Sequence, residues 1–295
     1  MIGLTRIKFS PGWGAGVRYA SLVCVAMYLV FSPPGSGTCT AATSVSQQHL
    51  LIAGSGTNLS ITRLLAKTFM QVHPNIIIEI PESIGSGAAI HAVSDGAIPI
   101  GLISRPLEGN ENSLGLMVVD YAKTPLVIGV HPTVPDNGLS YNDLLDIYRG
   151  KKNRWKDGKE IIVLTREPGE SSIDLLAREI PGFAKVYNAS QKAELWSTLR
   201  KDQVMNQTLA KTPHAIGISD LGTIAIEHLR IKPLSINGIV PSPKSIKNGT
   251  YKLVKTLSLI YKKEDLSPSA KLFIDFVQSA SAAKLLINNG FATGK

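Results

Sequence analysis

From Leu50 onward, the chain alternates between short, mostly apolar runs and longer segments in which apolar residues recur at helical spacing. The apolar runs predict strands at residues 50–53, 75–80, 98–103, 125–130, 161–165, 215–219 and 256–261. Helical spacing predicts helices at residues 59–70, 88–93, 141–148, 171–179, 193–201 and 268–288. A strand followed by a turn and a helix, repeated in this way, predicts an α/β fold built on parallel sheets.

The first 42 residues follow a different pattern. They hold three basic residues and no acid, then an apolar run at 19–31, then small residues ending in Ala41 and Ala42. The run is shorter than the roughly 20 residues that span a bilayer as a helix. This pattern predicts a cleaved signal peptide over residues 1–42 and export to the periplasm. Two alternatives are an uncleaved membrane anchor and a lipoprotein attached through Cys39. A lipoprotein usually has an aliphatic residue three positions before the cysteine, where this chain has Ser36.

Composition narrows the class of protein further. A hydrophobic fraction of 44% and a charged fraction of 18% are typical of globular chains and rule out wholesale disorder. The formal net charge is +9, and the leader carries three of these positive charges. Both cysteines, Cys24 and Cys39, lie in the leader. The rest of the chain therefore cannot build a disulfide framework, a zinc knuckle or a thiol nucleophile.

Several predicted strands end in turns rich in glycine, serine and threonine that open a helix. These turns occupy residues 54–58, 83–87 and 104–106, and residues 165–172 form a fourth that carries Arg166. A helix N-terminus offers unpaired N–H groups and the positive end of the helix dipole, and arginine binds oxyanions with paired hydrogen bonds. Each turn alone is explained by helix capping, but four at strand–helix junctions predict an anion site.

These segments resemble the phosphate-binding solute-binding proteins of ABC transporters, which are two-lobed periplasmic proteins. The resemblance rests on LIAGSGTN at 51–58, SIGSGAAI at 83–90, IGLISRPL at 100–107 and REPGESS at 166–172, and on segments as far as NNGF at 288–291. It implies that Thr57 and the N–H of Asn58 contact phosphate from the first loop, and Ser86 from the second. From the fourth loop it implies the same for Arg166, Ser171 and Ser172.

Two residues depart from the family pattern. Ser104 stands at the end of the third strand, where well-known members have an aspartate that accepts a hydrogen bond from protonated phosphate. In the fourth loop, Glu170 replaces the family's serine. One hypothesis is that Glu170 takes over the acceptor role and pairs with the arginine; the other is that it points to solvent as an acid in the first helical turn. Arg105 is a further basic candidate near the third loop.

The resemblance implies a type II periplasmic-binding-protein fold of two α/β lobes, each with a mostly parallel sheet flanked by helices. Two hinge crossovers are expected, near residues 126–129 and 227–232. The first lobe would comprise residues 43–126 and 227–295, and the second lobe residues 127–226. The implied function is hinge closure on inorganic phosphate and its delivery, by a monomer, to the permease subunits of an ABC transporter.

Three other functions remain open at this stage. An enzyme is disfavoured because the chain lacks a P-loop and a nucleophile elbow and its six histidines lack metal-ligand spacing, so we expect no cofactor and no metal. A nucleic-acid binder is suggested by the basic cluster at 149–156 with Trp155, although an exported chain favours a solvated loop. A binding protein or sensor for another oxyanion fits the same fold, and Ser104 favours it.

Overall fold

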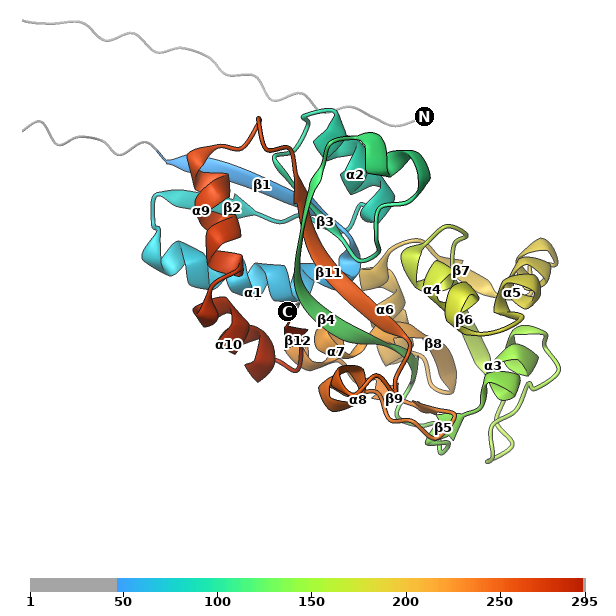
Figure 1. The fold of residues 1–295 in the computed structure, drawn as a ribbon. Coiled ribbons are helices and arrows are strands. Elements are labelled where there is room, and N and C mark those ends of the chain that lie inside the picture. Colours follow the sequence, from blue (N-terminus) through green and yellow to red (C-terminus); the bar gives the residue numbers. More distant parts are fainter. Residues whose placement is uncertain (1–46, 294–295) are drawn as a thin grey trace, which may run out of the picture. The chain divides into compact units, whose positions relative to one another are not determined.

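This computed structural model describes residues 47–293. Most of its strands form one continuous hydrogen-bonded sheet (Figure 1). The predicted signal peptide and both cysteines lie outside the described residues. In order, the strands are β2 (Ile76–Glu79), β1 (Gln48–Gly54), β3 (Ile100–Ile103), β11 (Val254–Tyr261), β4 (Met117–Val130), β8 (Ala215–Asp220), β6 (Ile162–Arg166) and β7 (Ser197–Leu199). The short strands β9 (Lys232–Pro233) and β12 (Ala292–Thr293) pair with β4, and β5 (Gly138–Leu139) pairs with β10 (Ser235–Ile236).

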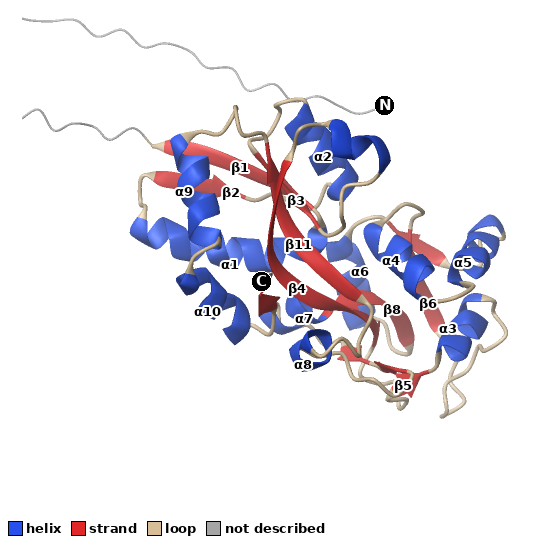
Figure 2. Cartoon of the chain, in the orientation of Figure 1, coloured by secondary structure: helices blue, strands red, loops and turns tan. Residues whose placement is uncertain are grey.

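Helices pack around these strands (Figure 2). They are α1 (Gly56–Val72), α2 (Ser86–Ser94), α3 (Tyr141–Tyr148), α4 (Ser171–Glu179), α5 (Phe183–Lys192), α6 (Asp202–Lys211), α7 (Leu221–Ile226), α8 (Pro243–Lys247), α9 (Pro268–Val277) and α10 (Ala280–Asn288). Within residues 47–293, none of them is both long enough and apolar enough to cross a bilayer.

The strand directions divide the path into two parallel groups. β1 pairs in parallel with β2 and β3, and β6 pairs in parallel with β7 and β8. β11 is antiparallel to β3 and β4, and β4 is antiparallel to β8. We call the β1–β3 group with α1, α2, α9 and α10 the first lobe, and the β6–β8 group with α3 to α6 the second lobe. The predicted two-lobed α/β fold is confirmed.

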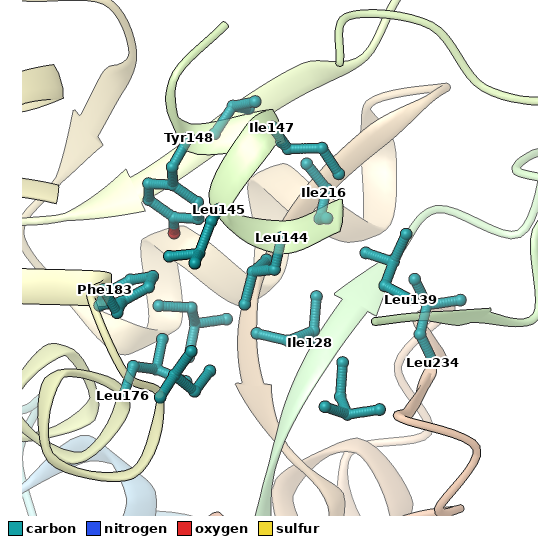
Figure 3. Packing of buried hydrophobic residues seen from close by; sticks show 14 of the residues in the cluster. Ile128, Leu139, Leu144, Leu145, Ile147, Tyr148, Leu176, Phe183, Ile216 and Leu234 are labelled. Atoms are coloured by element: carbon teal, nitrogen blue, oxygen red, sulfur yellow. The ribbon is translucent and has the colours of Figure 1, made fainter. Parts of the chain in front are cut away.

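Each lobe has its own apolar core. In the first lobe, Phe69 of α1 packs edge-on against Phe273 of α9, with ring centroids 5.4 Å apart. The second-lobe core contains Tyr148 and Phe183, with centroids 5.1 Å apart, together with the leucines of α3 (Figure 3). Trp155 is also buried in this core, so the aromatic residue of the basic cluster is not available to stack on a base.

Two neighbouring passages connect the lobes. β4 pairs with β11 up to Pro125 and with β8 from Leu126 onward, so one strand serves both lobes. The return passage differs from the expectation of residues 227–232, because Leu234, Tyr251 and Leu253 still pack in the second-lobe core. The chain leaves that core as β11 begins, where Leu126 N–H donates to Leu253 O at 2.8 Å.

Two helix predictions are wrong. Residues 193–201 contain no helix: they hold β7, which joins the edge of the sheet by pairing with β6, while α5 and α6 lie on either side. The single helix expected at 268–288 is two helices, because the Ser279 side chain accepts from Ala282 N–H and starts α10 anew. The helices α5 to α8 were not predicted, nor was the first half of β4.

Candidate functional site

The loops that follow β1, β2, β3 and β6 surround one cleft of about 250 Å³. The carboxyl ends of parallel strands meet at one sheet edge, which explains why these loops converge. Of the predicted residues, Ser86, Arg105, Arg166, Glu170 and Ser171 line the cleft. The cleft is completed by Ser55, Ser83, Ile84, Gly85, Gly87, Glu167, Pro168, Gly169, Arg200 and Asp202.

The first loop presents Ser55 to the cleft rather than the two residues predicted from it. Thr57 and Asn58 are buried in the first turn of α1 and are not among the lining residues. Asn58 Nδ2 donates to Ile103 O at 3.2 Å and to Tyr121 Oη at 3.0 Å, so its side chain ties α1 to β3 and β4. Its N–H donates to Ser55 O at 3.1 Å.

The second and third loops are joined through Ser86 and Ser104. Ser104 N–H donates to Ser86 Oγ at 3.2 Å, and both residues are buried. The turn before α2 requires Gly85, whose φ of +82° lies in the left-handed region. Ser104 Oγ lies 2.8 Å from Ser55 Oγ and 3.2 Å from Ser171 Oγ, so this residue connects the first and fourth loops.

Arg166, at the end of β6, is the most deeply buried of the three arginines that line the cleft, the others being Arg105 and Arg200. Its side chain is only 4% exposed. One terminal nitrogen donates to Leu199 O at 3.1 Å, and the other lies 3.6 Å from Asp202 Oδ1. Its Nε lies 3.8 Å from Glu170 Oε2 and has no hydrogen-bond partner among the described residues. The guanidinium is thus held in place with donor capacity remaining.

Glu170 points inward, so the alternative of a solvent-facing acid is wrong. As the N-cap of α4, it accepts from Ser172 N–H at 2.9 Å and from the Ser171 hydroxyl at 3.0 Å. Its side chain is 12% exposed and lies 3.8 Å from both Arg166 and Lys255. Burial alone would raise the pKa of Glu170, but Lys255, Arg166 and the Ser172 N–H hold that pKa below its ordinary value. Ser172 itself is buried and contributes its backbone to this cap.

Lys255, on β11, is the functional candidate that sequence reasoning missed. Its side chain is 0% exposed, and its Nζ donates to Ser171 Oγ at 2.6 Å and to Ser104 Oγ at 3.2 Å. Lys255 is spaced by two residues from each of the buried Leu253 and Leu257, and this alternation was the signal that the Lys255 side chain is buried.

Two further charged residues define the edge of the site. Asp202, also missed, begins α6, and burial together with the charge of Glu170 raises its pKa despite the opposing effect of Arg166. Arg105 lines the cleft but forms two hydrogen bonds to Glu111, at 2.6 and 2.7 Å. The wall thus combines serine hydroxyls, helix N-termini and Arg166, which suit an oxyanion, with the carboxylates of Glu170 and Asp202.

A sequence profile of the PBP superfamily domain matches residues 38–281. The chain belongs to this superfamily. Among curated PBP relatives, the phosphate-binding protein PstS of Bacillus subtilis (strain 168) is 26% identical over 246 residues, which are 81% of this chain and 78% of that protein. PstS of Borreliella burgdorferi is 23% identical over 217 residues, which are 70% of this chain and 76% of that protein.

Solved PBP structures agree with the fold. A Clostridium perfringens protein, described as a phosphate ABC transporter substrate-binding protein and solved with phosphate bound, has a TM-score of 0.75 and 25% identity. The match covers 84% of this chain and 100% of that one. An ABC-type phosphate transport receptor from Vibrio cholerae has a TM-score of 0.59 and 22% identity, covering 83% of this chain and all of that one, and supports the fold alone.

Proposed function

We propose that this chain is a solute-binding protein that captures inorganic phosphate in the cleft and delivers it to an ABC transporter. The observation that carries the proposal is the buried Arg166, which faces a cleft opened by the N-termini of α1, α2 and α4. Phosphate binding is named for the PstS relatives, and phosphate binding to an ABC transporter substrate-binding protein is named for the Clostridium perfringens structure.

The proposed working motion is closure of the two lobes around the ion. We place the hinge where β4 and β11 pass between the lobes, near Pro125 and Val254. Ser55 and Ser86 belong to the first lobe, and Arg166 and Ser171 to the second. An ion held by both groups binds the closed form more tightly than the open form, and only such a difference in affinity shifts the equilibrium between them.

We further propose that the protein works outside the cytoplasmic membrane, after export through the leader at 1–42, as a monomer that docks on permease subunits. It carries out no catalytic step in this proposal. Ser104, in place of the family's acid, also favours a second candidate function: a binding protein or sensor for another oxyanion.

The deciding experiment is isothermal titration calorimetry on protein stripped of ligand by unfolding and refolding. Phosphate, sulfate, molybdate and arsenate are titrated in turn. We expect tight phosphate binding with little response to sulfate. Silence to phosphate with a response to another anion would support the second candidate, and silence to all four would contradict both.

A further inference from the structure

A buried chain of hydroxyl groups leads from Lys255 to the cleft. Lys255 Nζ contacts Ser104 Oγ at 3.2 Å, and Ser104 Oγ contacts Ser55 Oγ at 2.8 Å. Ser55 is 2% exposed and lines the cleft, whereas Lys255 does not reach it. Hydrogen bonds from the lysine thus reach the cleft by two routes: through Ser104 and Ser55, and through Ser171, which lines the cleft and donates to Glu170.

The ammonium group sets the direction of this chain. Lysine has three donors and no acceptor, so Ser104 Oγ must accept from Lys255. The hydrogen of Ser104 then goes to Ser55 or to Ser171. Ser171 already takes a hydrogen from Lys255 at 2.6 Å, so a second hydrogen aimed there would approach the cation. The contact with Ser55 is the shorter one, at 2.8 Å against 3.2 Å, and donation to Ser55 leaves the Ser55 hydrogen for the cleft.

We propose that Lys255 acts as a positioning residue that makes the Ser55 corner of the cleft a hydrogen-bond donor and so selects singly protonated phosphate. The inference rests on the proposed phosphate-binding function. Glu170 is the least exposed of the three carboxylates that line the cleft, and it supplies the inner acceptor for the single proton of the dianion. Asp202 and Glu167 are more exposed, at 21% and 44%. The doubly protonated monoanion would bring a second proton against the Ser55 donor and is disfavoured there.

Charged groups near Lys255 also influence how phosphate affinity changes with pH. They are Glu170 and Asp174 of α4, Arg166 of β6, Asp202 of α6 and Asp220 at the end of β8. Replacing Lys255 alters the charge that all of them experience. Ser104→Ala leaves the lysine charge in place and removes only the hydroxyl that links Lys255 to Ser55. Comparing the two variants therefore separates the effect of hydrogen-bond direction on phosphate affinity from the effect of the lysine charge.

The test measures phosphate affinity on either side of the second ionisation of phosphate, at about pH 5.5 and about pH 8. For the unaltered protein we expect affinity about tenfold tighter at the higher pH. Lys255→Met and Ser104→Ala should both reduce this ratio to about threefold or less, because the Ser55 hydroxyl oxygen can then accept a hydrogen bond from the second proton of the phosphate monoanion. Lys255→Met should also weaken binding at the higher pH. Lys252→Met, which removes an exposed lysine three residues away, is the matched control.

The outcomes separate the two proposals. An unaltered protein that binds no phosphate overturns the proposed function and this inference together. Phosphate binding whose pH ratio survives Ser104→Ala overturns the role of Lys255 alone. Should Lys255→Met fail to fold, Ser104→Ala still decides, because it only shortens a small buried side chain.

Discussion

At the scale of single residues, the inner wall of the cleft depends on how Glu170 is held. Its carboxylate closes the N-terminus of α4 and lies between two buried cations, Arg166 and Lys255. Desolvation of an isolated carboxylate would favour its protonated form, yet these neighbours keep it ionised. An ionised carboxylate only accepts hydrogen bonds, so it attracts an anion that carries a proton and repels one that does not.

Glu170→Gln should therefore reduce discrimination between phosphate and sulfate. The amide removes the repulsion of sulfate and replaces part of the acceptor with a donor. We expect the ratio of phosphate to sulfate affinity to fall by about tenfold or more, measured by calorimetric titration at one pH.

The control is Glu167→Gln, the same change of charge at the rim of the cleft, where the side chain is 44% exposed. It should shift the affinities for the two anions together and leave their ratio unchanged. If Glu170→Gln also leaves the ratio unchanged, Glu170 is not the discriminating acceptor.

At the scale of elements, local signals decided which predictions succeeded. The bounds predicted for α3 and α4 agree with the structure because each begins at a capping residue, Ser140 and Glu170, with apolar residues at helical spacing behind it. The segment that holds β7 carries no such signal: its strand exists because it pairs with β6. Pairing with a distant strand overrides local preference and cannot be deduced from a short window of sequence.

The short helix α7 depends on a buried acidic cap, which gives a prediction for stability. Asp220 accepts from Thr223 N–H at 2.8 Å, and burial raises its pKa to about 7, well above the ordinary value of 3.8. The folded state thus binds this proton more tightly than the unfolded state. The stability that Asp220 contributes is fully present below about pH 4 and is lost as the pH rises through about 7.

Asp220→Asn keeps a capping oxygen and cannot ionise. Relative to the unaltered protein, it should be close to neutral at pH 4 and more stable by about 1 to 3 kcal/mol at pH 8, as followed by urea unfolding. Asp143→Asn in α3 is a control of opposite sign. There Lys152 and Ser140 lower the pKa of the carboxyl to about 2, so this variant should lose stability at neutral pH and little at pH 2. An Asp220→Asn effect independent of pH would contradict the account.

At the scale of the whole described region, the site is assembled from residues far apart in the chain. Lys255 and Ser171 are 84 positions apart, and Lys255 and Ser104 are 151 positions apart. The sequence could predict loops that end parallel strands, because each carries its own glycine and serine signal. It could not predict that a lysine of β11 lies beneath two of them, since that depends on strand order in the folded sheet.

One contact couples the two lobes at the cleft directly. Gly56 is the first residue of α1 and Asp202 is the first residue of α6, from opposite lobes. A Cβ added at Gly56 would overlap the Cβ and the carboxylate of Asp202. The backbone of Gly56 does not lie in the left-handed region, so alanine suits the helix itself and need not destabilise the first lobe. The overlap would instead hold the lobes apart.

Gly56→Ala should therefore weaken phosphate binding by about tenfold or more while the thermal unfolding midpoint changes little, because overpacking one contact typically costs about 1–3 kcal/mol. Asp202→Gly removes the overlapping atoms, so alanine at position 56 should cost little in that background. Calorimetric titration of the two single variants and the double variant measures this coupling. An equal loss of affinity from Gly56→Ala with and without the Asp202 side chain would show that the effect arises within α1 and not from the approach of the lobes.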